Sequence, residues 1–242
     1  MTDEAFRILG EPRLGGILIV ADHASNRVPA DIDLGIDLAL LEAHVALDIG
    51  VAAVAERMAR RPGSAAFLGN VSRLVCDFNR DPDSSGLIPE ASDGHPIPGN
   101  RVDAAGRAVR LKRFYQPYHT ALATLLDEAP PLLILSLHSF TPSLSSSPEE
   151  QRPWQVGVLY NQDERAARLA IPRFASEGLI VGDQQPYSGI ELNATMDRHA
   201  EAEGRAYLGI EVRQDQIADP AGQAEWAERL VRVANEVALG LE

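Results

Sequence analysis

Cysteine is almost absent from the sequence: Cys76 is the single cysteine in 242 residues, which excludes a disulfide within the chain. Cys76 lies between Val75 and Asp77 in a run typical of a strand, so we expect a buried structural thiol and not a nucleophile. Apolar runs near the roughly 18 residues of a membrane span are also lacking, which argues against a membrane partner. Residues 1–7 lack the basic and apolar regions of a signal peptide, and we therefore expect a cytoplasmic protein.

Positive charge is scarce. The chain has 22 Lys and Arg against 35 Asp and Glu, for a formal net charge of −13, and its basic residues form no cluster. Proteins that bind nucleic acids carry a basic patch or stripe, so DNA and RNA are excluded as expected partners. The acidity predicts a repulsive, well-solvated surface and leaves both the substrate and the oligomeric state open.

The pattern along the chain predicts an α/β fold. Hydrophobic residues make up 45% and charged residues 24%, as in ordinary folded proteins, and we expect one domain over residues 1–242. Because strands and helices alternate, we expect a mostly parallel central sheet with helices on both faces. The expected strands are near 16–22, 71–78, 132–137, 155–160 and 206–213, and the expected helices near 38–61, 103–129, 162–176, 191–204 and 221–240. Two segments rich in Gly, Pro, Ser and Asp, 81–100 and 141–153, are expected to be loops beside the site.

Three of the expected strands end in residues that can do chemistry. An apolar run ends in His138, a second ends just before His23, and a third leads into Glu211. Ligands of open α/β sheets bind outside the carboxyl ends of the strands, so we expect these three side chains to meet. Two imidazoles and a carboxylate are the groups that a metal hydrolase requires.

A third metal ligand is needed, because catalytic zinc takes three protein ligands and leaves one position for water. A helix through 41–50 would place His44 and Asp48 on one face. Asp48 in apolar surroundings is costly to bury unless it meets a cation, and either a metal or a distant Arg satisfies that requirement. Asn26 is a rival ligand, although a neutral amide is a poor zinc donor. His44 is expected to contact the substrate or to support a ligand.

Several residues are candidates for substrate binding. Asn79 and Arg80 close a strand-like run, and a planar guanidinium suits a carboxylate. Arg80 is the first choice for an anion and Arg73 the second. Tyr187 lies in a turn where it can contact a ligand; His199 follows on the next expected helix, where an exposed polar face explains it equally well.

Six segments of the chain, taken together and in order, resemble the N-formylglutamate amidohydrolase family from about residue 15 to about residue 219. That family is itself similar to the zinc carboxypeptidases, which share short matches around His138, around Asn79 and Arg80, and around Glu211. The six segments are Asp22-His-Ala-Ser-Asn, His44-Val-Ala-Leu-Asp-Ile-Gly, Ser72-Arg-Leu-Val-Cys-Asp-Phe-Asn-Arg, Leu137-His-Ser-Phe, Pro186-Tyr-Ser-Gly and Ile210-Glu-Val-Arg-Gln-Asp.

The resemblance implies a fold like that of the zinc carboxypeptidases, in the phosphorylase/hydrolase-like class. It implies that His23 and His138 bind Zn²⁺ or another divalent transition metal, that Asn79 and Arg80 hold a substrate carboxylate, and that Glu211 transfers protons. Carboxypeptidases have His-x-x-Glu where this chain has Asn26 as the fourth residue. Asp48 is therefore our expected third ligand on chemical grounds.

The expected function is metal-dependent hydrolysis of a linear amide in amino-acid catabolism. The substrate would be a small molecule with a carboxylate, an N-acyl amino acid such as N-formyl-L-glutamate, and the products formate and the free amino acid. Two alternatives remain: a zinc carboxypeptidase-like enzyme acting on a small peptide, and a non-catalytic protein that binds an acidic metabolite.

Overall fold

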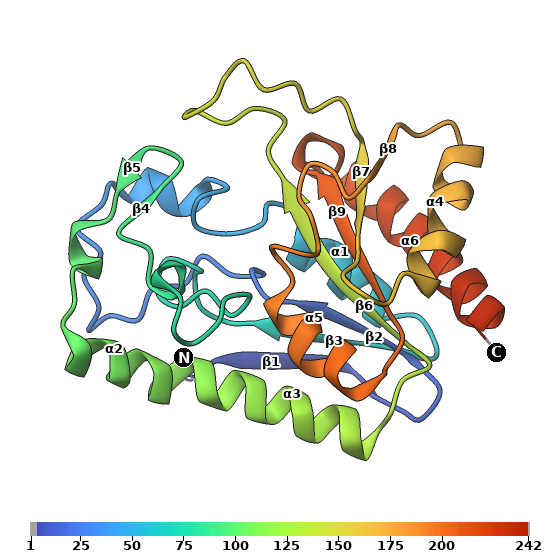
Figure 1. Cartoon of the computed structure of the whole chain (residues 1–242), viewed down its shortest axis with the longest axis horizontal. Helices are drawn as coiled ribbons and strands as arrows, with labels where there is room; N and C mark the ends of the chain where they lie inside the picture. Colours follow the sequence, from blue (N-terminus) through green and yellow to red (C-terminus); the bar gives the residue numbers. More distant parts are fainter. Residues whose placement is uncertain (1–3, 242) are drawn as a thin grey trace.

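A seven-stranded, mostly parallel sheet forms the centre of the computed structural model, which describes residues 4–241 (Figure 1). The strand order across the sheet is β1-β3-β2-β6-β9-β7-β8. Only β1 with β3 and β7 with β9 pair antiparallel among these neighbours. The strands are β1 (Phe6–Gly10), β2 (Ile17–Ala21), β3 (Ser64–Gly69), β6 (Leu133–Phe140), β7 (Val156–Leu159), β8 (Val181–Asp183) and β9 (Tyr207–Arg213).

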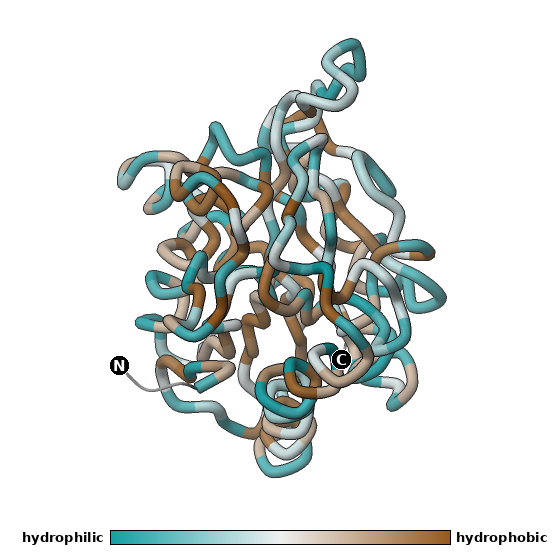
Figure 2. Tube along the Cα trace, turned by 90° about the vertical axis from the view of Figure 1, so that its left-hand side faces the viewer, coloured by the Kyte–Doolittle hydropathy of each residue, from teal (hydrophilic) through white to brown (hydrophobic). Residues whose placement is uncertain are grey.

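The central strands β2, β6 and β9 are buried along almost their whole length because helices cover both of their faces. One face is covered by α1 (Val51–Ala59), α4 (Arg165–Ser176) and α6 (Pro220–Leu241). The other is covered by α3 (Gln116–Glu128), which continues α2 (Ala104–Arg110) through a π-helical turn, and by α5 (Ala194–His199). Figure 2 shows the hydrophobic stretches of the chain gathered inside the molecule and the hydrophilic ones around its edge.

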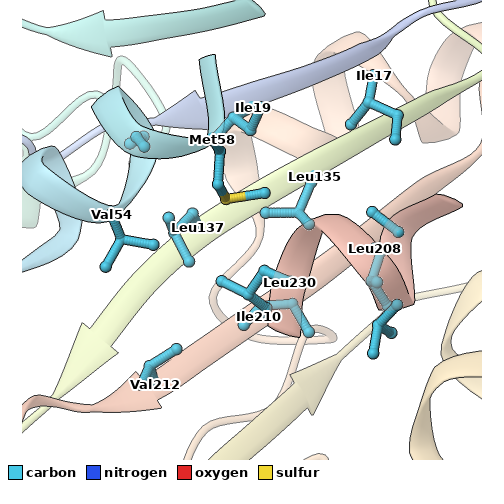
Figure 3. Packing of buried hydrophobic residues seen from close by; sticks show 14 of the residues in the cluster. Ile17, Ile19, Val54, Met58, Leu135, Leu137, Leu208, Ile210, Val212 and Leu230 are labelled. Atoms are coloured by element: carbon cyan, nitrogen blue, oxygen red, sulfur yellow. The ribbon is translucent and has the colours of Figure 1, made fainter. Parts of the chain in front are cut away.

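Side chains from α1 and α6 interlock with the sheet in the larger core cluster. Met58 of α1 and Leu230 of α6 pack over Leu135 and Ile210 of the central strands (Figure 3). These residues are at most 1% exposed, and burying a side chain of this size contributes about 1.5–3 kcal/mol. The core therefore fixes the positions at which β2, β6 and β9 end.

The structure confirms the predicted fold, a single domain around a mostly parallel sheet, but it corrects one strand. Residues 71–78 form turns and not a strand, and β3 lies earlier in the chain. The apolar side chains of this segment are buried against the core without joining the sheet, and the Ser72 hydroxyl accepts from Leu74 N and donates to Ala46 O. Such local side-chain bonds compete with a strand ladder. Cys76 is fully buried here, and burial raises the pKa of its thiol.

The expected helix over 38–61 is also shorter than predicted. Leu38–Glu42 form a 3-10 turn and α1 begins only at Val51, so His44 and Asp48 lie in turns and do not share a helix face. The chain bends at Gly50, which has a φ of 82° and lies against Ile217, where a Cβ would be 2.2 Å from the Ile217 carbonyl oxygen. Glycine tolerates this conformation and this close approach.

Two long segments rise over the carboxyl ends of the central strands, as expected. The first contains the short hairpin of β4 (Ala91–Ser92) and β5 (His95–Pro96), and the second, 141–153, contains no helix or strand. Asp93 at the tip of the hairpin accepts hydrogen bonds from the backbone N–H groups of Ser145 and Ser146 at 2.9 Å. The two segments are thus joined at their tips. None of the helices within residues 4–241 is long and apolar enough to cross a membrane.

Gly69 closes β3 against the residue that precedes His23. A Cβ added at Gly69 would lie 2.1 Å from the backbone oxygen of Asp22. We expect Gly69→Ala to lower the free energy of unfolding by about 1–3 kcal/mol, the usual cost of overpacking. Urea denaturation measures this loss, and Gly86→Ala is the control, because its Cβ would meet no atom closer than 3.4 Å. Equal stability of the two variants would contradict the prediction.

Candidate metal centre and active-site pocket

Two imidazoles and a carboxylate converge where β2 and β6 end. His23 follows β2, His138 lies in β6, and Asp48 lies in the turn before α1; they are 3%, 7% and 3% exposed. One possible ligand atom from each lies within 4.8 Å of the other two. Asp48 Oδ2 is 2.8 Å from His138 Nδ1 and 3.3 Å from His23 Nδ1. The Nδ1 atoms of both rings thus face one carboxylate oxygen.

The opposite nitrogen of each ring faces a further carboxylate. His23 Nε2 is 2.8 Å from Asp77 Oδ1, and His138 Nε2 is 3.4 Å from Asp22 Oδ2. Tyr118 donates to the other oxygen of Asp22 at 2.6 Å. Histidines that bind metals usually present one nitrogen to the ion and the other to a carboxylate, which fixes the ring. His23 and His138 are arranged in this way, because Nδ1 of each ring faces the site and Nε2 faces a carboxylate.

Arg73 bridges the carboxylates of Asp48 and Asp77. Its guanidinium donates to Asp48 Oδ1 at 3.4 Å and to Asp77 Oδ2 at 3.0 Å. The two interpretations left open for Asp48, a metal and a distant Arg, are therefore compatible, because the Arg contacts one oxygen and the imidazoles the other. Arg73 lines the pocket, but its guanidinium is already engaged by these two carboxylates.

The charged groups of this cluster shift one another's pKa values. Burial alone would raise the pKa of Asp48, but the two imidazoles hold it well below its usual range. Burial would lower the pKa of His138, but the nearby carboxylates of Asp22 and Asp48 raise this pKa well above its usual range. Burial and the charge of Arg73 would lower the pKa of His23, but the carboxylates of Asp77 and Asp48 raise it above its usual value. A metal ion would compete with these ring protons for the same nitrogens.

The donor set fits zinc. Two imidazole nitrogens and one carboxylate oxygen are typical catalytic ligands, and tetrahedral bonds of about 2 Å bring ligand atoms to roughly 3.3 Å from one another. The observed separations from Asp48 Oδ2 are 2.8 and 3.3 Å. Asn26 is not among the residues that line the pocket, and its side-chain nitrogen donates to Glu42 at 2.9 Å.

Glu211 lies beside this cluster, opposite His138 in the register of β6 and β9. It is 8% exposed, and its buried Oε2 has no hydrogen-bond partner within the described chain. Burial raises the pKa of Glu211 to about 7, with the positive charge on His138 opposing the shift and Asp48 adding to it. A buried carboxyl group with an unpartnered oxygen and a raised pKa is typical of a group that transfers protons.

The cluster forms one wall of a pocket of about 150 Å³. Asn79 and Arg80 line the same pocket. The Asn79 side chain accepts from Thr195 N at 3.0 Å, and the only carboxylate near the Arg80 guanidinium within residues 4–241 is Asp77, at 3.8 Å. The lining residues are His23, His44, Asp48, Arg73, Asn79, Arg80, His138, Ser139, Phe140, Thr141, Tyr187, Leu192 and Glu211.

The sequence predicted substrate contacts for His44, Tyr187 and His199. His44 and Tyr187 line the pocket, but His199 does not. His44 Nε2 is 3.0 Å from Asp93, so this ring connects the pocket wall to the hairpin tip. The structure corrects the prediction for His199, which is neither exposed nor at the pocket. It is 3% exposed, and its Nε2 is 2.9 Å from His119 Nδ1.

The His119–His199 pair supports the pocket from outside. His119 Nε2 is 3.1 Å from the carbonyl oxygen of Phe78, and Thr195 donates to the same oxygen at 3.2 Å. Phe78 directly precedes Asn79, so this pair fixes the segment that carries the two predicted carboxylate-binding residues. Sequence reasoning did not assign roles to Asp22, Asp77 or His119. For the two aspartates a signal existed, because each is part of a segment that carries a site residue.

A buried His-Asp-His group beside a carboxyl group, at the ends of strands in a mostly parallel sheet, is an arrangement suited to metal-assisted hydrolysis. The chain belongs to the N-formylglutamate amidohydrolase family, whose model matches residues 15–218. The gene product Atu2144 from Agrobacterium tumefaciens has a similar structure, with 29% identity, a TM-score of 0.90, and coverage of 97% of this chain and 94% of that one. The N-formylglutamate amidohydrolase from Ralstonia eutropha JMP134 shares the fold, with 21% identity, a TM-score of 0.77 and 97% coverage of both chains. No functionally curated protein matches the sequence.

The buried histidine pair predicts a pH-dependent stability. Burial lowers the pKa of His119 to about 3 and that of His199 to about 4. Both rings stay neutral in the folded protein while the unfolded chain takes up protons below about pH 6.5, so the pair's contribution to stability falls as the pH drops from about 6.5 towards 4. We expect His199→Asn to reduce this slope by up to about 1.4 kcal/mol per pH unit.

Urea denaturation at several pH values between 6.5 and 4 measures the slope. His95→Asn in the β4–β5 hairpin is the matched control, because it removes an imidazole that does not belong to the pair. A His199→Asn slope equal to that of the wild type would show that the pair does not titrate on unfolding.

Proposed function

We propose that this protein is a metal-dependent amidohydrolase that removes a formyl or other small acyl group from an N-acyl amino acid, such as N-formyl-L-glutamate. The observation that carries the proposal is the His23–Asp48–His138 group with the unpartnered oxygen of Glu211 beside it. Membership of the N-formylglutamate amidohydrolase family supports the reaction class. The expected metal is Zn²⁺ or another divalent transition metal, held by His23, Asp48 and His138.

A bound zinc ion would lower the pKa of water towards ~7 and polarise the acyl oxygen. The side chains of the protein then transfer protons and keep the ligands oriented. Glu211 accepts the proton of the attacking water and delivers it to the departing nitrogen, acting first as a base and then as an acid. Asp77 and Asp22 keep His23 and His138 oriented during this sequence.

Arg80 and Asn79, which both line the pocket, hold the substrate carboxylate. A guanidinium binds a carboxylate through charge-assisted hydrogen bonds, and an amide supplies one further donor. Fixing the carboxylate there turns the acyl carbon towards the His23–Asp48–His138 group. Correct placement of this kind accounts for a large part of the rate of well-oriented reactions, up to roughly 7–11 kcal/mol in intramolecular models.

The size of the pocket favours a small substrate over the peptide of the carboxypeptidase-like alternative. Its volume is about 150 Å³, whereas pockets for larger ligands hold roughly 300–1,000 Å³. The second alternative, a protein that binds an acidic metabolite without catalysis, gives no role to the buried and unpartnered oxygen of Glu211.

Metal content and formate release test the proposal together. We expect about one zinc per wild-type chain, as in catalytic sites with three protein ligands, and formate release from N-formyl-L-glutamate. His138→Ala should lose both, and His95→Ala is the control that should keep both. Zinc without formate release from any N-formyl amino acid would overturn the substrate class, and wild-type protein without metal, even after zinc addition, would overturn the metal centre.

Glu211→Gln separates proton transfer from binding. The amide has nearly the same size but accepts no proton at neutral pH, so we expect normal zinc content and a kcat lower by about 10²–10⁴-fold. Glu128→Gln, on the exposed end of α3, is the matched control and should keep the kcat of the wild type. A Glu211→Gln variant with near-normal kcat would remove this residue from the mechanism.

A further inference from the structure

Arg152 reaches the wall of the pocket from the loop 141–153. It is 6% exposed although it belongs to an irregular segment, and its Nη1 donates to the hydroxyl of Tyr187 at 3.0 Å. Its guanidinium carbon lies 5.1 Å from the centre of the Tyr187 ring. On the other side, Nε donates to Glu150 at 2.9 Å. Arg152 does not line the pocket itself, so any role that it has in the reaction acts through Tyr187.

The bond from Arg152 determines what the Tyr187 hydroxyl can do. A guanidinium only donates hydrogen bonds, so the phenolic oxygen must be the acceptor and its own hydrogen must point elsewhere. No other hydrogen-bond partner of this hydroxyl exists within residues 4–241. Tyr187 lines the pocket together with Glu211 and His138. The hydroxyl therefore has a hydrogen left to donate, on a side chain that lines the same pocket as these two residues.

A second Arg–Tyr pair in the same molecule shows the contrast. Arg168 donates to the Tyr160 hydroxyl at 2.8 Å and lies 5.1 Å from the centre of that ring, away from the pocket. There the Tyr160 hydroxyl donates in turn to Asp183, at 2.7 Å. The two pairs share their geometry, but the phenolic hydrogen of Tyr160 has a carboxylate acceptor in the protein and that of Tyr187 has none within the described residues.

We propose that Arg152 is a positioning residue, which holds Tyr187 so that its hydroxyl donates to the acyl oxygen of the substrate as negative charge develops there. This inference rests on the proposed amidohydrolase function. Donors fixed in advance towards a developing oxyanion stabilise the transition state more than the substrate. A cation bound to the phenolic oxygen also makes the hydroxyl a better donor. Burial, followed by the charge of Glu211, raises the pKa of Tyr187, so the hydroxyl keeps its hydrogen at neutral pH.

Steady-state kinetics on Arg152→Gln, Tyr187→Phe and the double variant test the coupling. We expect Tyr187→Phe to lower kcat by about 10²-fold, the usual effect of losing one oxyanion donor. Arg152→Gln should lower kcat by roughly 10-fold with KM almost unchanged, since the bond acts in the transition state. The double variant should be no slower than Tyr187→Phe, and Arg152→Lys, which keeps a donor, should recover part of the rate.

Arg168→Gln is the matched control, because it removes the same contacts from the Tyr160 pair. It should keep the kcat and KM of the wild type. The proposal is overturned if the effects of Arg152→Gln and Tyr187→Phe simply multiply in the double variant, or if Arg152→Gln changes KM and not kcat, because Tyr187 would then bind the ground state of the substrate. An equal loss of kcat in Arg168→Gln would overturn it as well.

Failure of the proposed function would be visible separately, as a zinc-loaded wild type that releases no formate from any N-formyl amino acid. The pairing itself is then measured by ultraviolet titration, in which the difference between wild type and Tyr187→Phe isolates the Tyr187 phenol. Arg152→Gln should raise the pKa of that phenol, because the guanidinium bond favours the phenolate. An unchanged titration would overturn the positioning role whatever the substrate is.

Discussion

The buried carboxylate of Asp48 is the constraint on which the site depends. It is 3% exposed, and an ionised carboxylate at such a depth is stable only where cations and donors surround it. Its Oδ2 faces the imidazoles of His23 and His138, and its Oδ1 faces the guanidinium of Arg73. Removing any one of these neighbours leaves charge without compensation, so the orientation of the two rings and the local stability are coupled.

The parallel sheet explains how residues so distant in sequence meet. β2, β6 and β9 are neighbours, and the register of β6 with β9 brings His138 beside Glu211. The sheet supplies the imidazole of His138 and the carboxyl group of Glu211 directly, while Asp48 comes from a turn in which its own backbone N–H donates to the carbonyl of His23. Strand positions set by the core, together with the hydrogen bonds of this turn, thus bring groups from four segments together.

The sequence predicted the fold class and the meeting of His23, His138 and Glu211, because apolar runs that end in polar residues carry that information directly. It did not predict that residues 71–78 form turns, since buried apolar side chains look alike in a strand and in a packed turn. The position of Asp48 was inferred from a helix that does not form, although burial cost alone had singled out the residue. His199 was misplaced because its partner, His119, lies 80 residues away and no local pattern links the two.

The hydrogen bonds that Asp93 accepts from Ser145 and Ser146 have a consequence for the engineering and divergence of this protein. Segments 81–100 and 141–153 are separate in the chain but share one anchoring carboxylate, which also contacts His44 at the pocket wall. Replacing one segment alone with that of a relative would leave the Asp93 carboxylate, or its hydrogen-bond donors, without a partner. We therefore expect an insertion or deletion in one segment to be accompanied by a change in the other. The two segments then evolve as one structural unit above the pocket.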